Sequence, residues 1–470
     1  MAKLLANVAF TESDQRWFAE ASGDCNPMHM DAIAARKTQP GRPVVHGIHA
    51  LLWALDSFFT ECPSETVGNL SVVFEKFIGV DTEISLWMFP SSSGYRLEIR
   101  SGATKLTKIR ISRQASGLPA TSLTAQAERM RRLERPIELN FDQASRAQGR
   151  LALEPCGTRF SALARQMGEG TAPTLMGLSY LVGMVCPGLH SIFSRLDLSF
   201  APGAVPDGDL VYSVSAAHDI FKLLTIDVAT SVFAGQIEAF LVPPVVQPGT
   251  RELRALVGKD EFSRVDALVV GGSRGLGEIT AKLLAAGGAR VAISYAVGSS
   301  DADRVVADIV GNGGSCVALP INVLAPIEEQ LAAVPFHPNQ VYYYATSKIF
   351  IQKQAVFEAS WLTEFQKIYV EGFFNLCQAL SARETGETVV YYPSSVAIDE
   401  RPADMVEYAM AKLAGELLCD ALDKHLPRVK TLLTRLPRLL TDQTATVVPV
   451  ETAEPSAIIL DILRRMKGRA

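Results

Sequence analysis

The sequence predicts a multidomain chain with an α+β first part and an α/β second part. In residues 48–112 an apolar helical stretch is followed by four β-rich segments, an order that suits a sheet packed around one helix. Residues 174–241 show the same order again. After the proline-rich stretch 242–252, six short apolar strands alternate with helical stretches, which predicts a doubly wound parallel sheet.

Composition and charge narrow the classes of function. The 470 residues carry a net charge of -5 and no long run of Lys and Arg, so binding to nucleic acid or to an anionic membrane is disfavoured. The seven cysteines form no C-x-x-C pair and no metal-ligand spacing with histidine, which indicates a reducing compartment. No apolar span reaches about 20 residues, and the first residues do not read as a signal peptide. We therefore expect a soluble cytoplasmic protein without nucleic-acid, membrane or metal partners.

The first predicted domain covers residues 1–120. Its helix runs from Ile48 to about Phe59 and gathers apolar side chains on one face. The β-rich segments that follow are separated by turn residues, which predicts antiparallel strands. They are Leu70–Phe77, Thr82–Phe89, Tyr95–Ser101 and Thr104–Ser112.

Upstream of this helix lies the most informative stretch, Ala21–His29 (ASGDCNPMH), followed by Gly41–Gly47 (GRPVVHG). Gly, Asn and Pro form turns rather than regular helices or strands, so we expect Asp24 and His29 on a loop. A carboxylate and an imidazole held there can grip a water molecule and serve as general base and general acid. The N–H of Gly47, at the start of the apolar helix, can polarise a thioester carbonyl.

This pair of motifs resembles the signature of the MaoC-like (R)-specific enoyl-CoA hydratases, S-G-D-x-N-P-x-H followed by G-x-x-V-x-H-G. Every fixed position of it is present. The resemblance implies a hot-dog fold and the addition of water to a 2-enoyl thioester. It also implies that Asp24 and His29 carry the proton transfers and that Gly47 donates to the enolate oxygen.

A second copy of the helix-and-strands order follows a polar segment. Residues 121–139 are predicted to be a linker containing an Arg-rich helical piece, AERMRRLER, with a solvated face. Residues 140–245 then form a second hot-dog-like repeat, in which the helical stretch Thr174–Gly188 precedes the strands. The stretch Arg165–Leu175 lacks an Asp and His pair, so we expect a double hot-dog with a non-catalytic second half. An unrelated α+β domain is the alternative.

The last predicted domain, residues 262–470, follows a linker at 246–261. Between its first strand and first helix lies a glycine-rich turn of Gly271, Ser273, Arg274, Gly275, Leu276 and Gly277. Such a turn lets a pyrophosphate approach the backbone at a helix N-terminus. Tyr408 and Lys412 are four residues apart on one predicted helix and share a face. Ser395 ends the preceding strand.

Together these residues resemble the short-chain dehydrogenase/reductase family, which has a Rossmann-type fold. The resemblance implies that Tyr408 is the general acid and base and that Ser395 orients the substrate oxygen. Lys412 would bind the nicotinamide ribose and lower the pKa of Tyr408, as a neighbouring ammonium does. The chain departs from the family pattern around the cofactor, which puts the proton relay and the cofactor affinity in question. These departures are Val270, Asn322, Tyr343–Thr346, Tyr369 and Pro437–Arg438.

The end of the second strand bears on the choice of cofactor. An acidic residue there usually binds the ribose 2′-hydroxyl of NAD, but this position is Tyr295. Arg274 in the glycine turn can meet a 2′-phosphate instead. The sequence therefore favours NADP(H) over NAD(H), bound by the glycine turn, Tyr295 and Lys412.

The two resemblances together predict a bifunctional enzyme. A hydratase interconverts 2-enoyl and (R)-3-hydroxyacyl thioesters, and a reductase interconverts 3-hydroxyacyl and 3-oxoacyl thioesters, so the two sites share one intermediate. The substrate would be an acyl-CoA or acyl-carrier-protein thioester of fatty acid metabolism, and both families imply a homodimer. Two alternatives stay open. In one, only the hydratase turns over; in the other, the hot-dog part binds acyl thioesters and presents them to the reductase.

Overall fold

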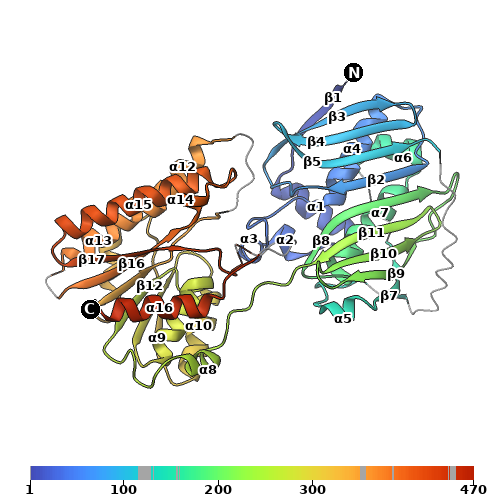
Figure 1. Cartoon of the computed structure of the whole chain (residues 1–470). Helices are drawn as coiled ribbons and strands as arrows, with labels where there is room; N and C mark the ends of the chain where they lie inside the picture. Colours follow the sequence, from blue (N-terminus) through green and yellow to red (C-terminus); the bar gives the residue numbers. More distant parts are fainter. Residues whose placement is uncertain are drawn as a thin grey trace. The chain divides into compact units, whose positions relative to one another are not determined.

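The computed structural model describes residues 2–114, 129–130, 132–154, 157, 159–349, 356–383, 386–442, 444 and 451–469. The chain forms two compact units (Figure 1). The first unit spans Met1–Pro244, and the second contains Val245–Ala445 and Val450–Ala470. Within the described ranges no helix combines the length and apolarity that crossing a bilayer requires.

The first unit is built on one sheet, which has eleven strands among the described residues. All of its pairings are antiparallel except that of the last two strands. In spatial order the strands are β1 (Lys3–Ala9), β3 (Glu83–Ser91), β4 (Gly94–Ser101), β5 (Thr104–Ser112), β2 (Asn69–Phe74), β8 (Ser191–Phe200), β11 (Phe233–Leu241), β10 (Leu223–Ala229), β9 (Asp209–His218), β7 (Gln148–Ala152) and β6 (Arg129–Met130). The two predicted repeats, residues 1–120 and 140–245, meet where β2 pairs with β8.

Two apolar helices fill the space beside this sheet. The first is α4 (Gly47–Glu61), whose predicted apolar face, including Leu51 and Phe58, is fully buried. The second is α7 (Thr171–Tyr180), continued by the π-helix η1 (Leu181–Val185) and buried nearly all round. A helix that is apolar all round belongs inside a core, and α4 and α7 indeed share one hydrophobic core. The other helices here are α1 (Glu12–Ser22), α2 (Pro27–Met30), α3 (Ala32–Ala35), α5 (Phe141–Ala144) and α6 (Ser161–Met167).

The Arg-rich piece expected as a helix is different in the structure. Arg129 and Met130 form strand β6, which pairs with β7 and places the Arg129 guanidinium 2.8 Å from Asp209. Arg132 is not a purely solvated side chain, because it donates to the backbone carbonyl oxygen of Glu20 at 2.6 Å. Strand pairing and these charge contacts outweigh helix propensity at this point. Residues 121–128 and Arg131 lie outside the described residues.

The second unit contains a six-stranded sheet in which all pairings are parallel. Its order is β14 (Ser315–Pro320), β13 (Arg290–Tyr295), β12 (Asp266–Val270), β15 (Gln340–Tyr343), β16 (Thr388–Ser395) and β17 (Val429–Leu436). The central strand β12 is buried on both faces: Ala267 and Val269 belong to one core, and Leu268 and Val270 to another. This explains why its sequence reads as a continuous apolar run.

Helices cover both faces of this sheet, as a doubly wound fold requires. One core contains residues of α9 (Gly275–Ala286), α10 (Ser299–Gly311) and α16 (Pro455–Lys467). The other contains residues of α11 (Ile327–Ala332), α12 (Ala359–Gln366), the π-helix η3 (Lys367–Gly372), α13 (Phe373–Ser381), α14 (Ala397–Glu400) and α15 (Val406–His425). The expected linker 246–261 contains α8 (Thr250–Leu253) and the 3-10 helix η2 (Arg254–Leu256). It is not a free linker, because the apolar Leu253 is buried in the core of the second unit.

Candidate active sites

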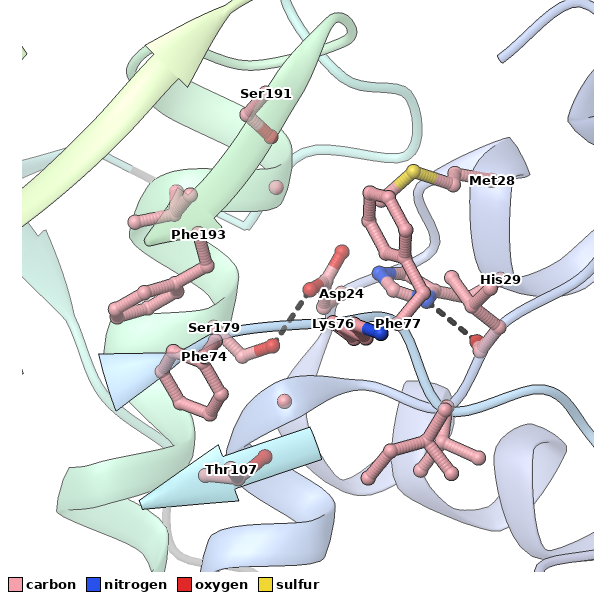
Figure 2. Close-up of a pocket in the computed structure, with 16 residues that line it drawn as sticks. Asp24, Met28, His29, Phe74, Lys76, Phe77, Thr107, Ser179, Ser191 and Phe193 are labelled. Atoms are coloured by element: carbon pink, nitrogen blue, oxygen red, sulfur yellow. Dashed lines mark hydrogen bonds between the residues drawn. The ribbon is translucent and has the colours of Figure 1, made fainter. Parts of the chain in front are cut away.

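Asp24 lies directly after α1, which ends at Gly23 in the left-handed conformation (φ 83°). A glycine adopts this conformation without strain, and it turns the chain so that the Asp24 side chain becomes 98% buried. Oδ2 of Asp24 accepts a hydrogen bond from the Ser179 hydroxyl at 2.7 Å (Figure 2), and Oδ1 accepts one from the Asn26 N–H at 3.2 Å. Burial raises the pKa of Asp24, while these donors and His29 oppose the rise.

His29 lies on α2 rather than on the expected loop. The Asn26 side chain caps this single helical turn by accepting from the N–H of Met28 at 3.0 Å, and Pro27 occupies its first position, both common at helix starts. Nδ1 of His29 is 2.7 Å from the Val44 carbonyl oxygen (Figure 2). A carbonyl only accepts, so Nδ1 carries the proton. Burial lowers the pKa of His29, which leaves Nε2 of a neutral ring free to accept a proton.

Gly47 begins α4, so its N–H has no acceptor within the helix. A side chain at this position would collide with the Phe74 ring, because an ideal Cβ on Gly47 lies 2.9 Å from a ring carbon. The glycine therefore keeps the start of the helix open.

One cavity of about 60 Å³ joins these three groups, space for about two water molecules. Both repeats line it (Figure 2). The first repeat contributes Asp24, Met28, His29, Val44, Val45, Gly47, Phe74, Lys76, Phe77, Ile78 and Thr107, and the second contributes Ser179, Val182, Gly183, Ser191 and Phe193. The three residues predicted from the sequence are thus brought together in one mostly apolar pocket.

The second repeat positions Asp24, a role that sequence reasoning missed. Besides Ser179, it supplies Gly183 on the π-helix η1, where an ideal Cβ would lie 2.3 Å from Oδ1 of Asp24. The Asn26 amide donates to the Gly183 carbonyl oxygen at 2.9 Å. In the sequence, the local signal for this role is the presence of Ser179 and Gly183 inside a long apolar helical stretch.

His46 supports both catalytic candidates. Its ring stacks on His29 at 3.8 Å between centroids, and its Nε2 is 3.1 Å from the carbonyl oxygen of Asp24. Its Nδ1 is 2.9 Å from Oε1 of Gln15. The ligand atoms of Asp24, His29 and His46 lie within 4.8 Å of one another. Both carboxylate oxygens of Asp24 already accept hydrogen bonds, and Nδ1 of His29 is bonded to Val44, which leaves few free ligand positions for a metal. Acid–base chemistry fits this cluster better than metal binding.

The second unit brings Ser395, Tyr408 and Lys412 into one neighbourhood. Tyr408 lies in the first turn of α15 and is 93% buried, and the nearby Ser395 at the end of β16 acts to lower its pKa. Burial raises the pKa of Tyr408 to about 12. This direction is opposite to the lowering that the sequence led us to expect. Burial is the cause, and Lys412 does not offset it: its Nζ donates to the carbonyl oxygen of Pro393 at 2.7 Å and lies 5.8 Å from the Tyr408 ring centre.

Tyrosines surround Lys412. Its Nζ is 4.0 Å from the ring centre of Tyr369 and 4.9 Å from that of Tyr392, and burial lowers the pKa of Lys412 to about 7. Tyr369 occupies the position expected for the relay asparagine, on the π-helix η3. The backbone carbonyl oxygen of Tyr369 accepts a hydrogen bond from the Tyr392 hydroxyl at 3.2 Å, and that of Ile368 accepts one from Tyr343 at 2.6 Å. Phenol hydroxyls therefore bond to the π-helix carbonyls in this unit.

The glycine-rich turn has the close backbone contacts that its sequence predicts. Gly271 has φ +79°, and its N–H donates to the Ser294 hydroxyl at 3.1 Å. An ideal Cβ on Gly277 would lie 2.3 Å from the Gly271 carbonyl oxygen, so only glycine lets α9 start here. Ser273 is buried within the turn, and Tyr295 is partly buried at the end of β13. The glycines leave the backbone at the start of α9 open to close approach, which suits the pyrophosphate of a dinucleotide.

Arg274 is paired with the carboxylates of Asp442 and Asp301, which no local sequence pattern indicated. Its guanidinium lies 2.7 Å from Oδ2 of Asp442, and its Nε lies 4.0 Å from Oδ2 of Asp301. The ideal Cβ of Gly275 is 3.9 Å from the other Asp442 oxygen, so this carboxylate lies against the glycine turn. The cation expected for a 2′-phosphate is therefore already paired.

Comparisons with known proteins agree with this division of the chain. Residues 3–102 match the model of the MaoC like domain, and residues 266–434 match that of the short chain dehydrogenases. A 3-oxoacyl-[acyl-carrier-protein] reductase of Synechocystis is 53% identical over 57 residues, 12% of this chain and 23% of that protein. An uncharacterized oxidoreductase of Methylorubrum extorquens is 28% identical over 110 residues, 23% of this chain and 43% of that protein. The chain thus spans less than half the length of these curated relatives.

Solved structures are also similar to part of the chain. A short chain dehydrogenase from Burkholderia cenocepacia in complex with NADP is 23% identical, with a TM-score of 0.40, and the match covers 44% of this chain and 91% of that one. A 3-oxoacyl-[acyl-carrier protein] reductase from Brucella melitensis with bound NAD is 18% identical, with a TM-score of 0.39, and the match covers 47% and 89%.

The family matches confirm the fusion that the two sets of motifs predicted. One chain carries a MaoC-like domain at residues 3–102 and a short-chain dehydrogenase domain at residues 266–434.

Proposed function

We propose that the first unit hydrates 2-enoyl thioesters to (R)-3-hydroxyacyl thioesters and catalyses the reverse dehydration. The observation that carries this proposal is that Asp24, His29 and Gly47 line a single cavity with the carboxylate fixed by Ser179. In this arrangement the double hot-dog has one catalytic half, and the second half positions its carboxylate. An acyl-CoA or acyl-carrier-protein thioester is the proposed substrate class.

The geometry assigns a role to each group. Nε2 of His29 takes a proton from a water molecule that Asp24 also holds, while the water oxygen forms a bond to C3 of the enoyl group. The electron pair of the C2–C3 double bond moves toward the thioester carbonyl, whose oxygen accepts from the Gly47 N–H. The enolate then takes a proton at C2 from the same acid–base pair, so one water molecule is added overall.

The test is hydration of crotonyl-CoA, followed by the loss of enoyl absorbance and by chiral analysis of the 3-hydroxybutyryl product. The proposal requires the (R) product and requires that Asp24→Asn and His29→Ala abolish its formation. Binding of crotonyl-CoA by the wild-type protein without any product would instead support the module that binds acyl thioesters and does not hydrate them.

A second activity is supported by the site around Tyr408. We propose that the second unit oxidises and reduces the 3-hydroxyacyl and 3-oxoacyl pair, which would make the chain bifunctional. The placement of Ser395 at the end of β16 beside the buried Tyr408 of α15 carries this proposal: Tyr408 would exchange a proton with the substrate oxygen that Ser395 orients. A nicotinamide cofactor supplies or accepts the hydride when bound. Gly271, Ser273, Arg274, Gly275, Leu276, Gly277, Tyr295 and Lys412 are its proposed binding residues.

Reduction of acetoacetyl-CoA, measured with NADH and with NADPH, tests the second activity. Tyr408→Phe should abolish it and leave the hydration of crotonyl-CoA unchanged. A wild-type protein that hydrates crotonyl-CoA but reduces no 3-oxoacyl thioester would support the hydratase-only alternative. The choice between NADP(H), which the sequence favours, and NAD(H) depends on the surroundings of Arg274.

A further inference from the structure

The charges around the glycine turn bear on which dinucleotide fits there. A 2′-phosphate distinguishes NADP(H) from NAD(H) and carries about -1.5 to -2 charges at neutral pH. A cation next to the turn that is free to pair with this phosphate strengthens its binding. Arg274 is the guanidinium at this position, and its side chain is only 19% exposed.

Arg274 is already paired on two sides. Asp442 lies 2.7 Å from one terminal nitrogen and Asp301 lies 4.0 Å from Nε. Both carboxylates are more than four-fifths buried, so solvent screens them weakly. A phosphate that approached Arg274 would have to displace one carboxylate or accept repulsion from both.

The neighbouring cations offer no replacement. Arg304 forms two hydrogen bonds of 2.8 Å to Glu278, and Lys282 is paired with Glu278 at 2.7 Å and with Asp308 at 3.0 Å. Within the described residues this network has three cations and four carboxylates, and every cation contacts at least one carboxylate. Its members are Arg274, Lys282, Arg304, Glu278, Asp301, Asp308 and Asp442.

Asp301 also supplies an acid near the second strand. Tyr295 ends β13 where an acidic residue would indicate NAD, and Asp301 follows six residues later in the first turn of α10. Its carboxylate reaches back to the guanidinium of the glycine turn. A buried carboxylate there accepts hydrogen bonds from a ribose diol and repels a phosphate, which is the discrimination that the usual acid provides.

We infer that Asp301 and Asp442, by holding Arg274, make the second unit select NAD(H) over NADP(H). This inference rests on the proposed dinucleotide site, and it is opposite to the preference that Arg274 and Tyr295 suggest when only the sequence is considered. Asp301 and Asp442 are then residues that determine cofactor specificity, and neither takes part in the proton transfers.

The test is the dissociation constant of the full-length protein for NADH and for NADPH, measured by calorimetry without acyl substrate. The wild-type protein should bind NADH at least tenfold more tightly than NADPH. Asp442→Asn should strengthen NADPH binding about tenfold and change NADH binding less than twofold. Asp301→Asn should weaken NADH binding and strengthen NADPH binding, because it removes both a diol acceptor and a repulsive charge.

Asp303→Asn is the matched control, because Asp303 lies on the same helix but is exposed, and both constants should stay unchanged. Wild-type binding of NADPH as tight as or tighter than that of NADH overturns the inference, whether or not the variants fold. If both variants fold and keep the wild-type ratio, the assignment of these carboxylates is wrong. Binding of neither dinucleotide overturns the proposed activity of the second unit, and with it this inference.

Discussion

The two candidate active sites are supported in different ways. In the first unit the candidate acid–base pair lines a cavity, and its support comes from Ser179 and Gly183, which follow the matched MaoC-like region in the chain. In the second unit Tyr408 and Lys412 are packed among tyrosine rings, and Lys412 bonds to a backbone carbonyl of the neighbouring strand. The first candidate site surrounds a cavity. The second has a shell in which large side chains take the place of small polar ones.

Burial has opposite consequences for the two sites. It raises the pKa of Asp24 and lowers that of His29, which brings a carboxylate and an imidazole closer to sharing a proton and suits acid–base work near neutral pH. Burial raises the pKa of Tyr408 to about 12 and lowers that of Lys412 to about 7, which moves the tyrosine away from neutral pH. We therefore expect the first site to be better suited than the second to proton transfer near neutral pH.

The largest effect should come from the carboxylate of the first site. Asp24→Asn keeps the size of the side chain and one oxygen for Ser179 but removes the charge that holds the water proton. We expect the hydration of crotonyl-CoA to fall about 1,000-fold, within the range of general acid–base catalysis. The same preparation should reduce acetoacetyl-CoA as fast as wild type if the sites act independently. A hydration rate within tenfold of wild type would exclude Asp24 from the chemistry.

Gly183→Ala tests whether the second repeat positions the first site. The new methyl group would need the space 2.3 Å from Oδ1 of Asp24, so the carboxylate must move by about 1 Å. A displacement of that size costs about 100-fold in rate, and kcat should fall more than KM rises. Gly157→Ala is the control, because among the described residues an ideal Cβ there has no neighbour within 4 Å. Equal effects of the two variants on kcat would show that Gly183 does not position Asp24.

These two predictions show how far the sequence informs the fold and the first site. The motif singled out Asp24, His29 and Gly47 because these candidate residues are close together in the chain. Ser179 is 155 positions from Asp24, and no local pattern reports that contact. The single turn α2 was predicted as a loop, since four residues give no helical periodicity. Strand β1 was not anticipated either, because pairing with β3 decides its structure.

The second unit shows the same limit. All six strands of its sheet follow from short apolar runs that alternate with helical stretches, and the four inner strands β13, β12, β15 and β16 are buried on both faces over most of their length. The hydrogen bonds of Tyr343 and Tyr392 to η3 join residues more than 20 positions apart. The pairing of Arg274 with Asp442 joins residues 168 positions apart. Charge compensation of this kind depends on tertiary structure, so the sequence alone suggested a free arginine.

A pH series distinguishes the buried lysine of the second site from an ordinary one. The folded protein binds a proton at Lys412 with a pKa of about 7, whereas the unfolded chain does so near 10.5. Between these values the unfolded state holds more protons, so the free energy of unfolding must rise with pH in this window. Relative to Lys412→Met, the rise for wild type should approach 1.4 kcal/mol per pH unit at most.

The measurement needs a reporter confined to the second unit. Cys377 and Cys419 are buried thiols of this unit, so their labelling in urea, read by mass spectrometry, follows its unfolding. Wild type and Lys412→Met should be compared at each pH between 7 and 9, where differences in thiol reactivity cancel. A wild-type protein whose advantage over the variant stays constant across this window would contradict a depressed lysine pKa.

The smallest effect should come from the shell around η3. Tyr392→Phe removes the hydroxyl that donates to the Tyr369 carbonyl oxygen at 3.2 Å. Loss of one such bond should lower the free energy of unfolding by about 1 kcal/mol, with hydration in the first unit unchanged. It also frees a carbonyl oxygen on the π-helix that a water molecule can bond to. If the tyrosine shell restricts proton supply to Tyr408, reduction of acetoacetyl-CoA should become faster despite the lower stability.

Tyr342→Phe separates these two effects. It deletes a buried hydroxyl of the same sheet that bonds to Oε1 of Gln340 at 2.6 Å and makes no bond to η3. Both variants should lose similar stability, and only Tyr392→Phe should change the rate of reduction or its pH profile. Equal rates in the two variants would show that the tyrosine shell only packs the core. Faster reduction by Tyr392→Phe would show that the aromatic side chains around η3 restrict the transfer of protons between solvent and Tyr408. The two sites would then differ in how easily protons reach them.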